Sequence, residues 1–149
     1  MYLIFDCETT GFPKNWNSPI TDFENWPRVV QLAWQIHDVS GKLLEVKNFI
    51  IKPDGYSIPY NSQEIHGIST ERAKKDGISL SKVLDEFTDD LKNISFLIGH
   101  NVSFDNNVLG CEFLRSQREN VLSKIQSIDT KELSTDFCQI TGGRGGRFK

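Results

Sequence analysis

The chain has few cysteines and no long hydrophobic run. Its 149 residues include three cysteines, Cys7, Cys111 and Cys138, an odd number with no CxxC pair. This count argues against a disulfide framework and favours free thiols in a reducing compartment, so we expect a cytoplasmic protein. No stretch approaches the roughly 20 apolar residues that cross a bilayer. No positive segment precedes the short apolar run at residues 2–5, so we predict neither a membrane span nor a signal peptide.

An excess of positive charge is also absent, since the formal net charge is −3. The last eight residues, GGRGGRFK, hold Arg144, Arg147 and Lys149, and without these three the chain has 14 basic and 20 acidic residues. An acidic body is unusual for a protein that binds nucleic acid. Metal ions bound at an acidic site would supply the positive charge that phosphate needs. Net charge therefore leaves a nucleic-acid partner open.

Short apolar and β-branched segments predict a sheet. We expect strands over residues 1–7, 28–38, 42–52, 95–99 and 125–128, with a two-residue hairpin turn at Ser40-Gly41. Residues 13–27 contain three prolines and no period, which is typical of a long loop. That loop would serve as a lid or as a partner surface.

Helices are expected between the later strands. A short helix would begin at Ser69 or Thr70, a second follows Ser79 with apolar residues at helical spacing, and a third would be capped by Ser103. A further helical turn would follow residue 129. Three antiparallel strands followed by strands that alternate with helices favour one α/β domain with a mixed sheet flanked by helices.

Two carboxylates interrupt the first apolar run, MYLIFDCETTGF. Residues i and i+2 of a strand share a face, so Asp6 and Glu8 would project together while Cys7 faces the opposite layer. Carboxylates this close repel each other unless a cation lies between them. Mg²⁺ and Mn²⁺ prefer such oxygen ligands. The alternative is that the strand ends at Phe5 and both acids are solvated turn residues.

A third carboxylate, Asp105, lies in IGHNVSFDNNV. A buried strand would end at Gly99, which places Asp105 in the first turn of the next helix, where open α/β sheets build their sites. The alternative role for Asp105 is to stabilise the helix dipole. Together with Asp6 and Glu8 it gives three carboxylates that would converge on one edge of the sheet.

Three motifs resemble those of a known family. FDCETTGF resembles the first motif of the DnaQ-like (DEDDh) 3′–5′ exonucleases, GHNVSFD resembles their second, and EIHGIS resembles a stretch between the two. The resemblance runs from Met1 to about Asp129. It implies a ribonuclease H-like fold and metal-dependent hydrolysis of phosphodiesters from a 3′ end to nucleoside 5′-monophosphates. The FDCETTGF form is closer to proofreading-type members than to oligoribonucleases, which favours DNA.

The resemblance also implies roles for individual residues. Asp6 would bridge two divalent ions, Mg²⁺ or Mn²⁺, Glu8 would hold the first, and Asp105 would act on the second, directly or through water. The residues implied in substrate binding are Thr9, Thr10, Gly11, Phe12, Ile65, His66, Asn101 and Phe104. Structural alternatives stay open: Phe12 packed under the long loop, threonine hydroxyls that satisfy the turn, and His66 as a turn residue. The partners would be a nucleic acid with a free 3′ end and a polymerase or repair protein.

One expected motif is missing. The family carries H-x-x-x-x-D near its C-terminus, where the histidine is the general base, but no unassigned histidine follows His100 here. We therefore expect residues 1–141 to form an exonuclease domain that is incomplete at its C-terminal end, with residues 142–149 as a flexible Gly/Arg tail. Activity would then be impaired. The alternatives are a non-catalytic module that binds nucleic acid or another partner, and a phosphohydrolase for small phosphate esters.

Overall fold

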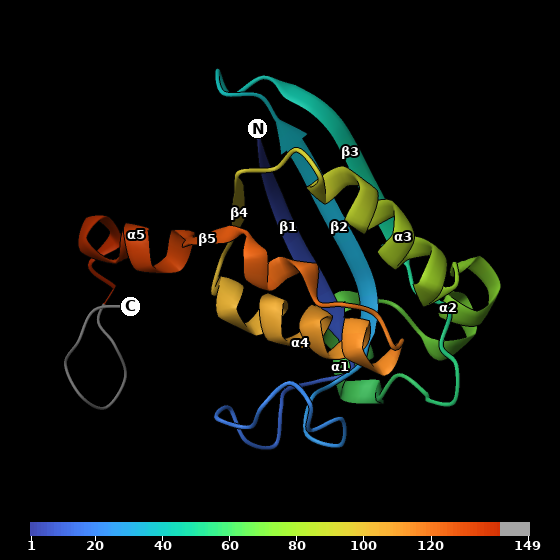
Figure 1. The fold of residues 1–149 in the computed structure, drawn as a ribbon. Coiled ribbons are helices and arrows are strands. Elements are labelled where there is room, and N and C mark those ends of the chain that lie inside the picture. Colours follow the sequence, from blue (N-terminus) through green and yellow to red (C-terminus); the bar gives the residue numbers. More distant parts are fainter. Residues whose placement is uncertain (141–149) are drawn as a thin grey trace.

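A mixed sheet in the order β3-β2-β1-β4-β5 is the framework of the molecule (Figure 1). The computed structural model describes residues 1–140. The strands are β1 (Tyr2–Thr9), β2 (Val29–His37), β3 (Leu43–Ile50), β4 (Phe96–Gly99) and β5 (Gln126–Asp129). β1 pairs antiparallel with β2 and β2 with β3, whereas β4 pairs parallel with β1 and with β5. The predicted mixed sheet, an antiparallel meander followed by parallel strands, is confirmed.

Helices fill the connections between the later strands. They are α1 (Tyr60–His66), α2 (Thr70–Asp76), α3 (Leu80–Leu91), α4 (Val102–Arg115), the 3-10 helix η1 (Val121–Lys124) and α5 (Thr130–Cys138). Ser69 caps α2 as predicted, because its side chain accepts a hydrogen bond from the backbone N–H of Arg72. α1 was not predicted as a separate helix.

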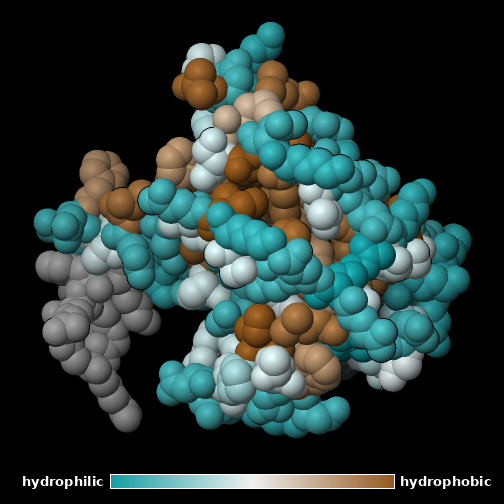
Figure 2. All heavy atoms as spheres, in the orientation of Figure 1, coloured by the Kyte–Doolittle hydropathy of each residue, from teal (hydrophilic) through white to brown (hydrophobic). Residues whose placement is uncertain are grey.

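The main core lies between one face of the sheet and the helices α3 and α4, which pass in front of the strands in Figure 1. Alternate β1 residues, Leu3, Phe5 and Cys7, face this layer. The residues between them, including Ile4 and Asp6, are exposed. A smaller cluster packs α2 against the start of β2. Hydrophobic residues appear on the viewed surface in small groups among hydrophilic ones (Figure 2).

A buried ion pair joins α4 to the beginning of β2. The Glu112 carboxylate is 1% exposed, and its Oε1 accepts hydrogen bonds from Arg28 Nε at 2.8 Å and from the backbone N–H of Val29 at 3.1 Å. Arg115 lies 3.3 Å from the same oxygen. A buried carboxylate needs such partners, because removing one of them leaves an uncompensated charge. The contacts fix α4 against the strand that neighbours β1.

Two local predictions were wrong. The turn between β2 and β3 is longer than two residues, since the Asp38 carboxylate accepts hydrogen bonds from the backbone N–H groups of Ser40 and Lys42 and draws them into the turn. The cap of α4 is Asn101, in the left-handed region with φ 63°, and not Ser103. The backbone N–H groups of Asn101 and Val102 donate to Asp129 at 2.8 and 3.1 Å. This partner comes from β5, so local sequence does not reveal it.

Within residues 1–140, no helix is long and apolar enough to cross a membrane. The three cysteines are free, as predicted: Cys7 and Cys111 are buried and Cys138 is exposed. The predicted Gly/Arg tail, residues 142–149, lies outside the described residues.

Candidate active site

The end of β1 places two carboxylates on one face of the sheet. β1 continues to Thr9, so the alternative in which the strand stops at Phe5 is wrong. Asp6 is exposed and Glu8 is partly buried, while Cys7 between them is buried beneath α4. The register of β1 against β2 shifts between Glu8 and Thr9, which marks a bulge where the strand ends. Bulges of this kind often lie next to active sites.

Asp105 approaches the same strand end from the first turn of α4, where it contacts Cys7. It is 3% exposed, and its Oδ1 accepts hydrogen bonds from the backbone N–H of Cys7 at 3.1 Å and from the Cys7 thiol at 2.9 Å. Burial raises the pKa of Asp105 to about 6; the Cys7 hydrogen bond opposes this rise and the negative charge of Asp6 adds to it. Asp105 therefore does more than stabilise the helix dipole.

The neighbouring groups have shifted pKa values as well. Burial raises the pKa of Asp6, and the nearby His100 ring lowers it. Burial raises the pKa of the Cys7 thiol well above its usual range, and the charges of Asp105, Asp6 and Glu8 act in the same direction. The charges of all three carboxylates therefore act on the pKa of the same thiol. This crowding of acids at a strand end is typical of a functional site.

A divalent cation fits the chemistry of these donors. Carboxylate oxygens are the ligands that Mg²⁺ and Mn²⁺ prefer, and a cation between them would relieve the repulsion by Asp6 that adds to the burial-raised pKa of Asp105. Among residues 1–140, however, no three His, Cys, Asp or Glu side chains are placed so that they could hold one ion. The fold brings the carboxylates to one strand end without closing them into a ligand set.

A cavity of about 120 Å³ lies beside the carboxylates. It gathers six of the eight predicted substrate-binding residues, together with three others. Its walls are Cys7, Glu8, Thr9, Gly11, Phe12, Ser62, Ile65, His66 and Phe104. β1, α1 and α4 all contribute to it. Thr10 and Asn101 are the predicted binding residues that do not line this cavity.

The threonine hydroxyls both bond to backbone groups, Thr9 within the turn and Thr10 across to the start of β2. Thr9 Oγ1 donates to the Gly11 carbonyl at 2.6 Å, and Thr10 Oγ1 accepts from the backbone N–H of Arg28 at 3.0 Å. The Thr9 contact is the one expected if a hydroxyl holds the turn itself, and the Thr10 contact ties the turn to Arg28. Gly11 has φ 141°, which a side chain would strain. The turn residues therefore shape the cavity wall.

His66 and Asn101 have different surroundings. His66 Nδ1 accepts a hydrogen bond from the backbone N–H of Ile68 at 3.1 Å, so the ring carries its proton on Nε2. Nε2 is buried and has no hydrogen-bond partner among residues 1–140, which leaves it as a donor at the cavity. The side-chain oxygen of Asn101 instead accepts from Lys131 Nζ at 3.2 Å.

Phe12 does not pack beneath the long loop. Its side chain is 73% exposed, and its ring centroid lies 6.1 Å from that of Phe104 and 6.0 Å from that of Trp16. Sequence reasoning missed Trp16, which lies in a loop without a periodic signal. It also missed Ser62, a buried cavity residue on α1, and the hydrogen bonds of Cys7 to Asp105. The position of Cys7 within D-x-E was the available signal for that contact.

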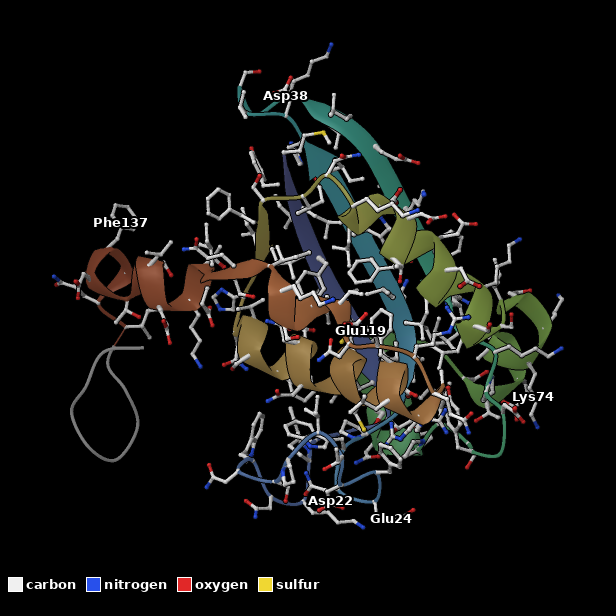
Figure 3. The ribbon with its side chains drawn as sticks, viewed as in Figure 1. Asp22, Glu24, Asp38, Lys74, Glu119 and Phe137 are labelled. Atoms are coloured by element: carbon white, nitrogen blue, oxygen red, sulfur yellow. The ribbon has the colours of Figure 1, made fainter. Side chains whose placement is uncertain are left out.

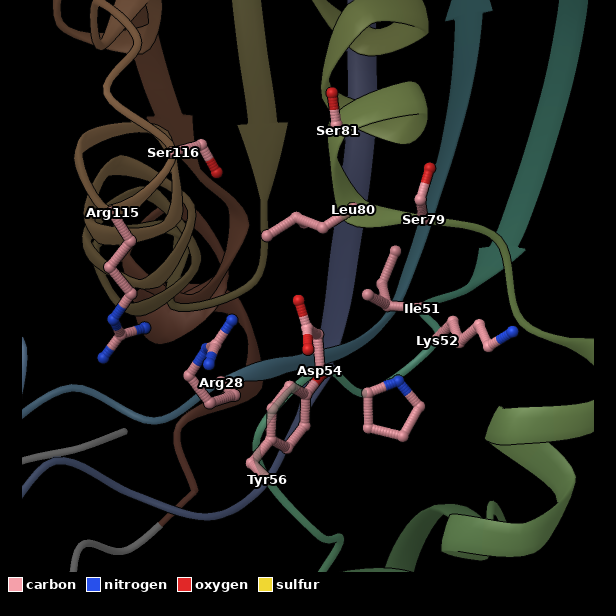
Figure 4. Close-up of a pocket in the computed structure, with 11 residues that line it drawn as sticks. Arg28, Ile51, Lys52, Asp54, Tyr56, Ser79, Leu80, Ser81, Arg115 and Ser116 are labelled. Carbon is pink, nitrogen blue, oxygen red and sulfur yellow. The ribbon is translucent and has the colours of Figure 1, made fainter.

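A larger cavity, about 490 Å³ in volume, contains none of the predicted residues (Figure 4). It lies where the start of β2 meets the N-terminus of α3 and the C-terminus of α4. At the edge of this cavity, the Arg28 guanidinium lies over the Tyr56 ring, 4.4 Å from the ring centre. Burial raises the pKa of Tyr56 to about 12, so this phenol stays neutral. The carboxylates lie outside this cavity, and its size alone does not make it the active site.

The sheet order and the acids at the end of β1 define a class of protein. A meander joined to parallel strands, with carboxylates on β1 and at the start of α4, is the ribonuclease H-like arrangement of the DEDDh-type 3′–5′ exonucleases. A family model described as an exonuclease, RNase_T, matches residues 3–143. The chain belongs to this exonuclease family.

Solved structures of exonuclease I share the fold. The Escherichia coli enzyme in complex with a dT13 oligonucleotide superposes with a TM-score of 0.75 and 21% identity, over 97% of this chain and 30% of that chain. Its complex with a dA16 oligonucleotide has a TM-score of 0.76 and 20% sequence identity, over 99% of this chain and 33% of that chain. An exonuclease I complex with SSB-Ct has a TM-score of 0.74 and 20% sequence identity, over 97% of this chain and 31% of that chain. The chain thus spans about one third of these proteins. No curated protein sequence matches it.

Proposed function

We propose that this chain is the metal-binding part of a 3′–5′ exonuclease that removes nucleoside 5′-monophosphates from nucleic acid, with DNA preferred. The observation that carries the proposal is the placement of Asp6 and Glu8 at the end of β1, with Asp105 hydrogen-bonded to Cys7 between them, next to a cavity of about 120 Å³. Exonuclease I has been solved with single-stranded oligonucleotides, which supports a single-stranded 3′ end as the substrate.

Asp6 and Glu8 would hold one divalent ion, Mg²⁺ or Mn²⁺, and Asp6 and Asp105 would hold a second. Each ion would then have two of these carboxylates, which agrees with the lack of a three-residue ligand set among residues 1–140. Bound there, the ions would supply a more acidic water and neutralise charge on the phosphate. The residues of the chain do the positioning. Phe12 and Ile65 form the apolar walls of the cavity, and the Nε2–H of His66 is a donor for an oxygen of the terminal nucleotide.

None of the three histidines of this chain belongs to the expected C-terminal H-x-x-x-x-D motif, and each has another contact. His37 stacks on Tyr2 at 5.3 Å, His66 Nδ1 is occupied by a backbone N–H, and His100 Nδ1 lies 3.2 Å from Thr130 Oγ1. Loss of a general base typically slows a reaction by about 10²- to 10⁴-fold. We therefore expect slow cleavage by residues 1–149. This observation also favours the second candidate, a module on the same fold that binds nucleic acid without cutting it.

The test uses 5′-labelled single-stranded DNA with Mn²⁺. We expect slow shortening from the 3′ end, release of nucleoside 5′-monophosphates, and loss of both in Asp6→Ala. Asp136→Ala, an exposed acid on α5, is the matched control and should behave as wild type. Shortening that persists in Asp6→Ala would contradict the proposal. Binding of the oligonucleotide without any shortening would favour the non-catalytic module.

Two further assignments belong to the same proposal. The three free cysteines support a reducing compartment such as the cytoplasm. A polymerase or a repair protein would be the protein partner of a proofreading-type exonuclease. Co-purification of the tagged full-length protein from its own cells tests this second assignment.

A further inference from the structure

A triangle of aromatic rings lies at the rim of the small cavity. The ring centroids of Phe12, Trp16 and Phe104 are 5.7 to 6.1 Å apart, distances at which aromatic rings attract one another. Phe12 is 73% exposed and Trp16 54%. Large aromatic side chains exposed together are uncommon on a soluble surface and mark sites of interaction.

The loop that carries Trp16 is held in place. The Asn25 side chain accepts from the backbone N–H of Asn15 at 2.7 Å and donates to the Asn15 carbonyl at 3.0 Å. The Trp26 indole donates to the Pro19 carbonyl at 3.1 Å, and Arg115 donates to three carbonyls of the loop. Trp16 therefore directly follows Asn15, whose backbone is held by the Asn25 side chain. Preorganisation of this kind lowers the entropic cost of binding.

The aromatic triangle shares two residues with the wall of the small cavity. Phe12 and Phe104 are walls of the cavity and corners of the triangle, whereas Trp16 belongs only to the triangle. A strand whose last base enters the cavity would present its next base to Trp16. Every base has a flat π-face, so stacking needs no particular sequence. It does need a base whose face is free, and a base inside a duplex has both faces covered.

We propose that Trp16 stacks on the unpaired base next to the 3′-terminal nucleotide, so that the loop of residues 13–27 selects single-stranded nucleic acid. This inference rests on the proposed function, since it requires a 3′ end in the cavity. It adds a residue and a loop that the motifs do not contain. The ring acts on binding and leaves the chemistry to the carboxylates.

Tryptophan fluorescence reports on this contact directly. The chain has three tryptophans, of which Trp26 and Trp34 are 3% and 2% exposed, so quenching by a base comes from Trp16. The probe is (dT)8 in Ca²⁺, with affinity measured separately by anisotropy of a labelled copy. We expect saturable quenching in the wild type. Trp16→Leu, which keeps an apolar side chain without a flat ring, should bind roughly 5- to 150-fold more weakly.

Two further variants separate stacking from folding. Trp16→Phe should lose the quenching and keep the affinity within about threefold, because the second ring still stacks. Phe137→Leu is the matched control, since Phe137 is 91% exposed on α5, far from the loop residues Asp22 and Glu24 in Figure 3. Its affinity should equal that of the wild type. A blunt duplex should bind Trp16→Leu and the wild type equally.

The outcomes distinguish the two proposals. If the wild type binds (dT)8 and Trp16→Leu binds it equally well, the role of Trp16 is wrong while the proposed function stands. If the wild type does not bind the oligonucleotide, the proposed function fails and the inference fails with it.

Discussion

The loop of residues 13–27 and the helix α5 differ in an instructive way. The loop has no regular secondary structure, yet Asn25 and Trp26 are 6% and 3% exposed and Trp26 belongs to the main core. α5 is a regular helix in which no residue is buried. Its apolar residues Leu133 and Phe137 are 72% and 91% exposed. Figure 1 shows α5 extending away from the sheet, whereas the loop lies beneath α4.

The difference shows that regular hydrogen bonding and tertiary packing are separate properties. α5 is attached at its first turn: Thr130 Oγ1 donates to the Gly99 carbonyl at 3.0 Å, and Asp129 accepts from the backbone N–H of Lys131 at 2.9 Å. Helices shorter than about 12–15 residues are marginal in water without packing. We therefore expect the loop to be the more rigid of the two in residues 1–140.

Removal of Trp26 should have the largest effect. Trp26→Ala deletes a core indole and its hydrogen bond to Pro19, so the free energy of unfolding should fall by about 3–5 kcal/mol. Urea unfolding measures this loss. Phe137→Ala on α5 is the matched aromatic control and should change stability by less than about 0.5 kcal/mol. Equal losses in the two variants would remove the contrast between loop and helix.

Titration of Asp105 should have the next largest effect. Asp105 lies in the first turn of α4, where the loop contacts Phe104 and where α5 is attached through Asn101. Its pKa rises from 3.8 to about 6 on folding, so the folded state holds the proton more tightly. Stability from this group is fully present below pH 4 and is lost as the pH rises through 6.

Without metal, the wild type should therefore lose up to about 3 kcal/mol between pH 4 and 7 relative to Asp105→Asn. Urea unfolding in EDTA across this range provides the comparison. Asp136→Asn on α5 serves as the control and should follow the wild type. Parallel curves for the wild type and Asp105→Asn would show that Asp105 titrates normally.

Polar substitutions on α5 should have the smallest effect. Leu133→Ser and Phe137→Ser replace exposed side chains, so each should change the free energy of unfolding by less than about 0.5 kcal/mol. In hydrogen exchange, the amides after the first turn of α5 should exchange faster than the amide of Asn15, which donates to a buried side chain. Strong protection across α5 would mean that another surface covers Leu133 and Phe137.

Much of this arrangement could be predicted from local patterns. The run from Met1 to Cys7 identified β1, the spacing of apolar residues from Leu80 to Leu91 identified α3, and the D-x-E motif placed Asp6 and Glu8 on one face. These predictions work because the spacing of apolar and polar residues along a short segment indicates which of its faces is buried.

Other features depend on residues that are distant in the sequence. Asn101 adopts the left-handed region because Asp129, 28 residues later, binds its backbone N–H. Trp16 approaches Phe104 because Arg115 and Asn25 hold the loop. No periodic pattern marks such contacts, so the aromatic triangle could not be read from residues 13–27 alone.

The distribution of the thiols has a practical consequence for labelling. Cys7 and Cys111 are buried with raised pKa values, which keeps both as unreactive thiols, whereas Cys138 at the end of α5 is exposed. A maleimide dye should therefore attach at Cys138 in the folded protein without any engineered cysteine. The least packed helix thus carries a natural attachment point, distant from the loop that contains the exposed tryptophan.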